Sequence, residues 1–267
     1  MPSQKPLRIL FRTLLFYCGA TLLFIIVSAL VPALKLRPVP LVTIGTAVVL
    51  TFILLVIFCR WNNSSLKAAG ISFQRKSLSY FFMGYILGLV LIIAWVLLTL
   101  VLTPYQLSLN AGSHISAVPS AFLLFLFVAI REELVYRSYF LQSLTTAFTT
   151  IIALLIVTIV FILEHRAAGI SWKTSIIGSG LGGVLFGIAA IKTKGIALPV
   201  GLHSAWNFGR WAFGLTGSRG IWHYTNTYGN SIKDETATLT TYAIVLLIAI
   251  IFLWLLPINK ISTRFNL

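Results

Sequence analysis

The chain has 267 residues, of which 58% are hydrophobic and only 9% are charged, and its mean hydropathy is +0.98. About a quarter of the residues of a soluble domain are charged, so this composition excludes a soluble globular protein. The net charge of +15 comes from Lys and Arg residues scattered between apolar runs. That distribution is typical of the loops of a membrane protein and does not indicate a nucleic-acid partner.

Apolar runs close to 20 residues long predict an all-α, polytopic transmembrane bundle of about eight spans, because the bilayer core is about 30 Å thick. No segment shows the alternation of apolar and polar residues that is typical of the strands of a membrane β-barrel. We expect no internal repeat, so that residues 1–267 form a single integral membrane domain. The predicted spans are 10–31, 41–59, 78–102, 119–141, 149–165, 174–191, 196–213 and 237–257.

An even number of spans places both termini on the same side of the bilayer. The loops on the amino-terminal side carry eleven Lys and Arg residues, and those on the opposite side carry seven. Because basic loops stay on the cytoplasmic side, the sequence predicts a multi-pass protein with cytoplasmic termini.

The fourth predicted span contains four charged residues, in a chain with only five Asp and Glu residues. A charge at membrane depth costs about 2.5–3.5 kcal/mol on insertion scales. Glu133 and Arg137 are four residues apart and are predicted to pair on one helix face. Glu132 is turned away from them, with Tyr136 as its neighbour, so this unpaired carboxylate is the candidate general base. Arg131 is predicted to reach outward; the alternative is that all four charges only hold helices together.

The fifth span ends with a histidine, His165, one turn after Phe161. A single histidine at the end of a span is usually an interfacial residue, so this signal is weak by itself. Glu164 falls on another helix face, where it is predicted to lie at the interface near Arg166 or Lys173.

The seventh span carries His203 and Asn207 at a spacing of four, which places both side chains on one helix face. Two such donors can bind a single oxygen, as in an oxyanion hole. The alternative is a hydrogen bond between helices, worth about 0.6–2 kcal/mol in a membrane. Gly201 and Gly209 flank this face and would permit close approach of another helix.

Taken in order, Glu-Glu-x-x-x-Arg at 132–137, Phe-x-x-x-His at 161–165 and His-x-x-x-Asn at 203–207 form a pattern. This pattern resembles the CPBP family, also called the Abi family, which includes CAAX prenyl endopeptidases and bacteriocin-processing enzymes. The resemblance covers a motif-bearing core of about 119–213. Residues 198–207 look typical of bacterial members, which implies the cell membrane of a bacterium.

The resemblance implies an intramembrane endopeptidase acting on a peptide or membrane-protein substrate. Glu132 would activate the attacking water with help from His165, and His203 and Asn207 would hold the developing oxyanion. The pair formed by Glu133 and Arg137 would brace the helix, the role that their spacing indicates independently.

The sequence leaves open whether a metal ion takes part in the reaction. Glu132, His165 and His203 are by type a catalytic zinc set, and the family has been described both as metalloproteases and as metal-independent glutamate proteases. We favour an enzyme without a metal cofactor, because no second carboxylate is evidently placed to orient the histidines.

Other intramembrane protease classes are excluded by their motifs. The chain contains no His-Glu-x-x-His sequence, which excludes a zincin-type metalloprotease site. No Asp falls within a predicted span, which excludes an aspartyl dyad. Ser179 lacks the preceding glycine of a rhomboid Gly-x-Ser-Gly motif, and the glycines around it predict a closely packed helix instead.

Two functions of other classes remain open on the sequence. Some proteins of the family act by binding others, in bacteriocin immunity or in the control of sensor kinases, so a non-catalytic membrane partner is the first alternative. A secondary transporter in which Glu132 carries a proton is the second, although the chain shows no inverted repeat.

Overall fold

The computed structural model describes residues 6–112, 115–216, 220–226 and 232–256. It confirms the all-α prediction, because these residues form eight continuous helices, close to the eight predicted spans. Two of the eight are interrupted by a π-helical stretch. The helical elements are α1 (Pro6–Ala33), α2 (Val39–Trp61), α3 (Arg75–Leu102), α4 (Ala117–Glu133), η1 (Leu134–Phe140), α5 (Leu141–Leu144), α6 (Thr150–Ala167), α7 (Trp172–Thr174), η2 (Ser175–Ser179), α8 (Gly180–Thr193), α9 (Ala197–Ala212) and α10 (Ile232–Leu255).

The eight helices are not equally suited to lipid. In the described part of the chain, six are long and apolar enough to cross a membrane. The remaining two are α9, whose 16 residues cover only about 24 Å at ~1.5 Å per residue, and the continuous helix α4–η1–α5, which carries the charged cluster. These two helices therefore need protein around them, and they carry all the predicted site residues except His165, which lies on α6.

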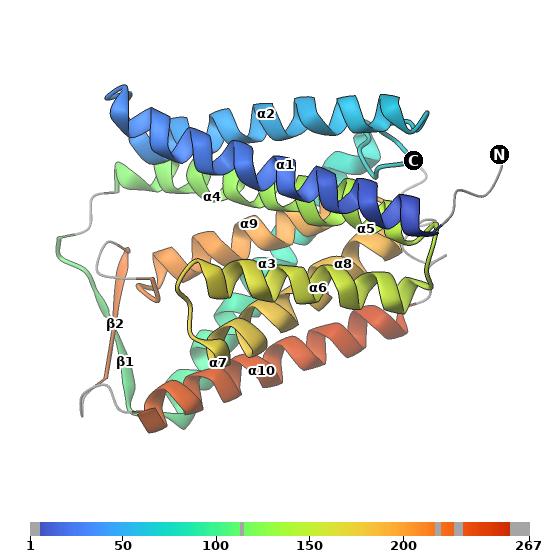
Figure 1. Ribbon diagram of the computed structural model, residues 1–267. Coiled ribbons are helices and arrows are strands. Elements are labelled where there is room, and N and C mark those ends of the chain that lie inside the picture. Colours follow the sequence, from blue (N-terminus) through green and yellow to red (C-terminus); the bar gives the residue numbers. More distant parts are fainter. Residues whose placement is uncertain (1–5, 113–114, 217–219, 227–231, 257–267) are drawn as a thin grey trace.

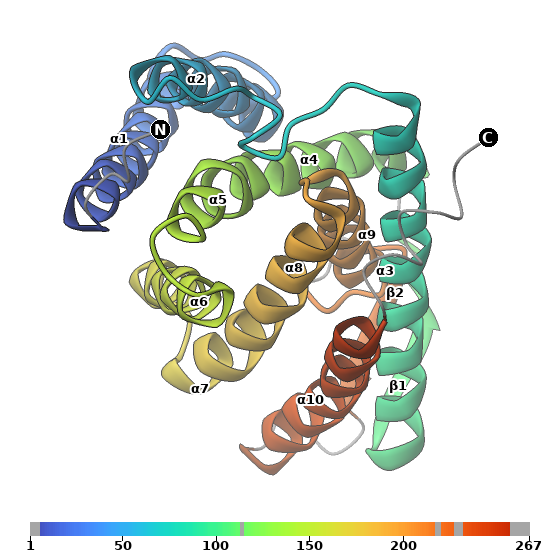
Figure 2. The ribbon, with the colours of Figure 1, turned by 90° about the vertical axis from the view of Figure 1, so that its right-hand side faces the viewer.

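The other helices surround this pair (Figures 1 and 2). Helix α9 packs against α3, α4 and α8, while α2 packs against α4 and α1 against α2. Helices α6 and α10 both contact α8. The start of α1 and the end of α10 lie at the same end of the bundle (Figure 1). The eighth predicted span ended at Pro257, which lies outside the described residues, and α10 begins five residues before that span at Ile232.

At the opposite end the structure adds a two-stranded antiparallel sheet that hydropathy does not reveal (Figure 1). Strand β1 (Tyr105–Leu109) pairs antiparallel with β2 (Trp222–Asn226), with Leu107 opposite Tyr224. The rings of Tyr105 and Tyr224 stack with their centres 4.3 Å apart. The two strands are more than 100 residues apart in the chain, so no local pattern announces their pairing.

Helices α3 and α9 approach each other through glycines. A Cβ atom on Gly201 would lie 2.0 Å from the carbonyl oxygen of Phe81, and one on Gly84 would lie 2.1 Å from that of Leu198. Real atoms do not approach so closely, so both positions require glycine. The predicted close approach at Gly201 is confirmed, and it holds α9 rigidly beside α3.

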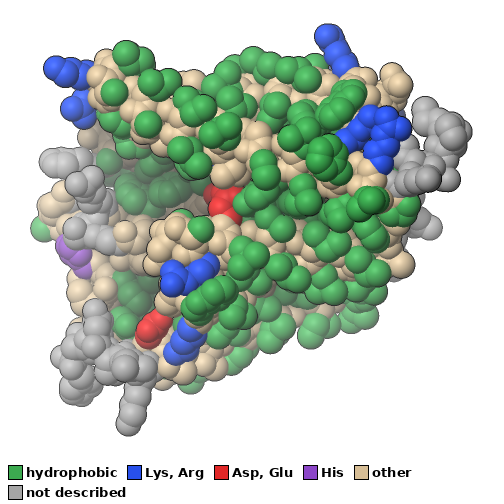
Figure 3. All heavy atoms as spheres, viewed as in Figure 1, with side chains coloured by type: hydrophobic (Ala, Val, Ile, Leu, Met, Phe, Trp, Pro, Cys, Tyr) green, Lys and Arg blue, Asp and Glu red, His purple; other side chains and the backbone are tan. Residues whose placement is uncertain are grey.

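The outer surface fits a bilayer. Large aliphatic side chains such as Ile25, Ile86 and Ile248 point outward and are exposed. Figure 3 shows hydrophobic side chains across the middle of one face, with Lys and Arg side chains gathered towards its two ends. The protein is therefore a multi-pass membrane protein, in which an apolar belt faces the acyl chains and basic residues reach the headgroups.

Candidate active site

The site is built around the point where α4 changes into a π-helix. Helix α4 is regular up to Glu133, and η1 then continues it as a π-helix from Leu134 to Phe140. All seven residues of η1 are buried. π-Helical turns are rare and frequently mark functional sites, and here the change of geometry follows directly after the two glutamates.

The predicted pair of Glu133 and Arg137 is confirmed. Nη1 of Arg137 lies 3.3 Å from Oε1 of Glu133, and both side chains are fully buried. Nη2 of Arg137 also donates to the carbonyl oxygen of Gly183 at 3.3 Å, and the guanidinium lies 4.6 Å from the ring centre of Phe161. A buried ion pair is tolerated when further hydrogen bonds satisfy its atoms. These contacts therefore fasten η1 to both α6 and α8.

His203 is oriented by the same glutamate. Its Nδ1 atom lies 2.9 Å from Oε1 of Glu133. A carboxylate can only accept, so Nδ1 carries a proton and donates it. The imidazole also stacks on the ring of Phe186, with centres 4.5 Å apart and planes 18° apart. Our expectation that no carboxylate orients the histidines is therefore wrong for His203, whose ring is held by an acid and an aromatic face.

Glu132 faces the other nitrogen of His203. Its Oε2 atom lies 3.7 Å from Nε2 of His203, an ion-pair contact longer than a hydrogen bond. The predicted isolation of Glu132 is thus wrong in part, because an imidazole stands opposite it. The Glu132 side chain is 17% exposed, whereas that of Glu133 is completely buried. The accessible carboxylate of the pair is therefore the one to which catalysis was assigned.

Arg131 does not reach outward as predicted. Its side chain is 3% exposed and its Nη1 lies 3.3 Å from Oε1 of Glu164. Tyr17 donates to Oε2 of the same carboxylate at 3.0 Å, and the hydroxyl of Tyr136 donates to it as well. Glu164 therefore belongs to a network between α1, α4, η1 and α6, and not to the interfacial basic residues after α6. Sequence reasoning missed this network, although one signal was available: two opposite charges inside apolar helices need partners.

His165 is anchored by its own helix. Its Nδ1 lies 2.9 Å from the carbonyl oxygen of Phe161, which can only accept, so the proton sits on Nδ1 and Nε2 of the neutral ring carries a lone pair. The ring meets that of Phe161 edge-on at 4.3 Å. Within the described part of the chain His165 makes no hydrogen bond or ion pair with Glu132. The pair of Arg131 with Glu164 nevertheless ties the residue before Glu132 to the residue before His165.

Asn207 lies one helical turn after His203 on α9 and is half-buried. Among the residues that the structure describes, its amide has no hydrogen-bond partner. His203 and Asn207 therefore lie on the same helix face, the first with an oriented imidazole and the second with an amide that is free among the described residues.

The alternative metal set of Glu132, His165 and His203 was tested against this geometry. Across residues 6–112, 115–216, 220–226 and 232–256, no three His, Cys, Asp or Glu side chains converge so that they could hold an ion. His203 and His165 both direct Nδ1 to an oxygen, as zinc-binding histidines do, but the three ligands are not assembled. The three residues as placed therefore do not fit a zinc ion.

Comparison with known proteins finds a family match for the segment that carries the site. Residues 114–209 match the family model described as type II CAAX prenyl endopeptidase Rce1-like. This range includes all three motifs and each of the site residues above. The comparisons found no matching curated protein and no matching solved structure. The part of the chain that carries the site is therefore similar to the type II CAAX prenyl endopeptidases of the Rce1-like family, in agreement with the resemblance of the motifs.

Proposed function

We propose that this protein is a glutamic intramembrane endopeptidase, which hydrolyses a peptide bond in a peptide or membrane-protein substrate without a metal ion. The observation that carries the proposal is the placement of His203 between two carboxylates. Nδ1 of this imidazole is held by Glu133 at 2.9 Å, and Nε2 faces Glu132 at 3.7 Å. The match of residues 114–209 to a protease family supports the reaction class.

The first step is activation of water. Glu132 is the more accessible of the two acids and accepts a proton from a water molecule. The resulting hydroxide attacks the carbonyl carbon of the scissile bond. His165 assists through Nε2, whose lone pair can accept a hydrogen bond from the second O–H group of the water. This hydrogen bond orients the water oxygen towards the scissile carbonyl. A positioned base of this kind contributes about 10²–10⁴-fold to the rate.

The second step is stabilisation of the tetrahedral oxyanion. Protonated His203, flanked by Glu132 and Glu133, donates from Nε2, and the amide of Asn207 donates from the same helix face. In known oxyanion holes, loss of one such donor raises the activation free energy by about 2.7–4 kcal/mol. Glu132 then passes its proton to the leaving nitrogen, the carbon–nitrogen bond breaks, and the products are a carboxylic acid and an amine.

We place the enzyme in the cell membrane of a bacterium with its termini in the cytoplasm. The excess of basic residues in the loops on the amino-terminal side supports this orientation. Both ends of the described bundle lie on the same side (Figure 1), as the predicted topology requires. On this placement the chain acts on a substrate that is itself held at the membrane.

The decisive experiment is a cleavage assay in liposomes containing the purified protein. Candidate peptides, prenylated and unprenylated, are incubated in ¹⁸O-labelled water, and the products are identified by mass spectrometry. We expect a defined cut with one ¹⁸O atom in the new carboxyl terminus, and loss of the cut in His203→Ala and Asn207→Ala. Substrate binding without any cleavage would favour the non-catalytic partner, and proton-coupled flux lost in Glu132→Gln would favour the transporter.

A further inference from the structure

A large cavity lies away from the proposed catalytic residues, at the end of the bundle where α1 begins and α10 ends. It encloses about 530 Å³ between α2, the segment that leads into α3, α4 and the turn between α8 and α9. None of Glu132, His165, His203 and Asn207 lines it. Among the residues that the structure describes, four lysines and no acidic residue line it: Lys67, Lys76, Lys192 and Lys194. The cavity is therefore separate from the proposed catalytic residues, and a ligand bound there does not depend on the protease activity.

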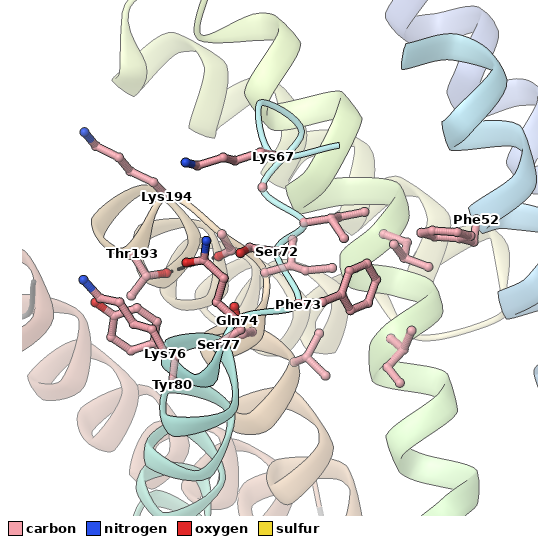
Figure 4. A pocket seen from close by; sticks show the side chains of 18 of the residues that line it. Phe52, Lys67, Ser72, Phe73, Gln74, Lys76, Ser77, Tyr80, Thr193 and Lys194 are labelled. Atoms are coloured by element: carbon pink, nitrogen blue, oxygen red, sulfur yellow. Dashed lines mark hydrogen bonds between the residues drawn. The ribbon is translucent and has the colours of Figure 1, made fainter. Parts of the chain in front are cut away.

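Two of these lysines supply uncompensated charge. In the described part of the chain the ammonium groups of Lys67 and Lys194 have no hydrogen-bond or ion-pair partner, and both side chains are exposed. In Figure 4 both side chains lie towards the same end of the cavity. Lys192 differs, because its Nζ donates to two carbonyl oxygens at the end of α10, those of Trp254 and Leu256, at 2.8 and 2.7 Å.

The backbone that presents Lys67 and Lys194 is well fixed. The amide of Ile196 donates to the carbonyl oxygen of Gly70 at 3.0 Å, which joins the segment after α2 to the turn before α9. Gly70 and Gly195 are in such close contact that a Cβ atom on either would approach the other's backbone to 3.1–3.2 Å. The two segments that carry Lys67 and Lys194 are therefore joined to each other and are not independent loops.

The other end of the cavity is apolar. Its walls there are Val48 and Phe52 from α2 and Ile130 and Leu134 from α4 and η1, with Phe73 beside them. In Figure 4 the rings of Phe52 and Phe73 lie on the side away from the two lysines. Phe73 is 86% exposed, so an apolar surface continues out of the cavity. The cavity is thus cationic at one end and hydrocarbon-like at the other, at the depth where helices meet the headgroups.

We propose that this cavity binds an anionic phospholipid. Its phosphate would lie between Lys67 and Lys194, and the start of an acyl chain would lie against Phe52 and Ile130. Basic pockets between transmembrane helices at the membrane surface bind anionic headgroups. The apolar half of the cavity favours a lipid over free phosphate, because a soluble anion would leave that half unused.

The test uses the full-length protein in a neutral detergent, titrated with phosphatidylglycerol or phosphatidylcholine. Thermal unfolding and native mass spectrometry follow stabilisation and retained lipid, since a ligand that binds only the folded state raises its Tm. We expect phosphatidylglycerol, and not phosphatidylcholine, to raise Tm and to remain bound. The variant Lys67→Gln/Lys194→Gln should bind it at least tenfold more weakly, and Lys67→Arg/Lys194→Arg should retain binding.

The matched control is Arg8→Gln/Arg60→Gln, which removes two exposed charges from the same end of the bundle without touching the cavity. It should bind phosphatidylglycerol like the wild type. An unchanged Tm in phosphatidylcholine shows that each variant is folded. Equal binding by the Gln variant and the wild type, or no retained lipid in the wild type, would overturn the proposal. Equal stabilisation by glycerol phosphate would assign the site to a soluble anion, and an acidic peptide that displaces the lipid without being displaced by it would assign it to a polypeptide.

Discussion

Oε1 of Glu133 lies 2.9 Å from Nδ1 of His203, and the same oxygen lies 3.3 Å from Nη1 of Arg137. One buried carboxylate therefore orients the imidazole on α9 and balances the guanidinium on its own helix. Glu133, which was predicted to brace the helix, is therefore in direct contact with the proposed catalytic residue His203. One oxygen atom of Glu133 takes part in both the ion pair and the orientation of the imidazole.

Glu133→Gln is expected to lower kcat by about 10²-fold or more, with KM little changed. The amide keeps the size of the side chain but removes the negative charge that stabilises the protonated imidazole, so Nε2 of His203 becomes a weaker donor to the oxyanion; loss of one such donor costs about 10²–10³ in kcat. Kinetics across a range of pH would check this, because a mispositioned imidazole changes the pH profile whereas general destabilisation does not. Glu235→Gln, at an exposed acid on α10, is the matched control.

Glu132→Gln should abolish cleavage while leaving the Tm of the protein nearly unchanged. The amide cannot accept the proton of water, and a general base contributes about 10²–10⁴-fold. The neighbouring Glu133 is fully buried and already engaged, so it cannot take over. Turnover of the labelled peptide and a melting curve on the same sample are the measurements, and residual activity above a tenth of the wild type would contradict the assignment.

Arg137→Met should destabilise the fold by about 3–5 kcal/mol, because it leaves Glu133 as an uncompensated buried charge. The double variant Glu133→Leu/Arg137→Met should lose less, since both charges are removed together. Free energies of unfolding in mixed micelles give the coupling between the two positions. If the two single losses simply add in the double variant, the pair contributes no coupling.

Gly201→Ala is expected to cost at least about 1–3 kcal/mol, the usual range for overpacking, because its new methyl group would lie 2.0 Å from the carbonyl oxygen of Phe81. Gly178→Ala is the comparison, since a Cβ atom there meets only Thr174 at an ordinary 3.7 Å. Thermal unfolding of both variants should show a large loss for the first and little for the second. If Gly201→Ala lowered the stability as little as Gly178→Ala does, α3 and α9 could move apart without cost, which would contradict the prediction.

Treatment with EDTA or 1,10-phenanthroline should leave the cleavage rate unchanged on the metal-free mechanism. The reason is that Glu132, His165 and His203 do not converge as an ion-binding set in the described structure. A zinc metalloprotease treated in parallel shows that the chelator is effective. Loss of activity that is restored by Zn²⁺ would assign the three residues to the alternative role.

Much of the fold could be predicted from local patterns alone. Hydropathy located eight helices, and their ends agree with the structure within about five residues, since the length of an apolar run reports the thickness of the bilayer. The contact of Glu133 with Arg137 followed from a spacing of four on one helix. Both results depend on residues close in the chain, for which helical geometry is sufficient.

The partners between helices needed the tertiary structure. Nothing in the spacing of Arg131 and Glu164, 33 positions apart, shows that they meet. Arg131 was predicted to reach outward, and Glu164 was predicted to lie at the interface near Arg166 or Lys173. The two-stranded sheet and the lysine cavity likewise join segments that lie far apart in the sequence.

The sequence by itself thus determined the membrane setting, the helices, the family resemblance and the residue types available for catalysis. Only the tertiary structure decided that His203 lies between Glu132 and Glu133. Helical periodicity specifies the face on which a side chain lies, but not the helix that packs against that face. That choice was made by the close packing of α9 between α3, α4 and α8, through glycines that allow no larger residue.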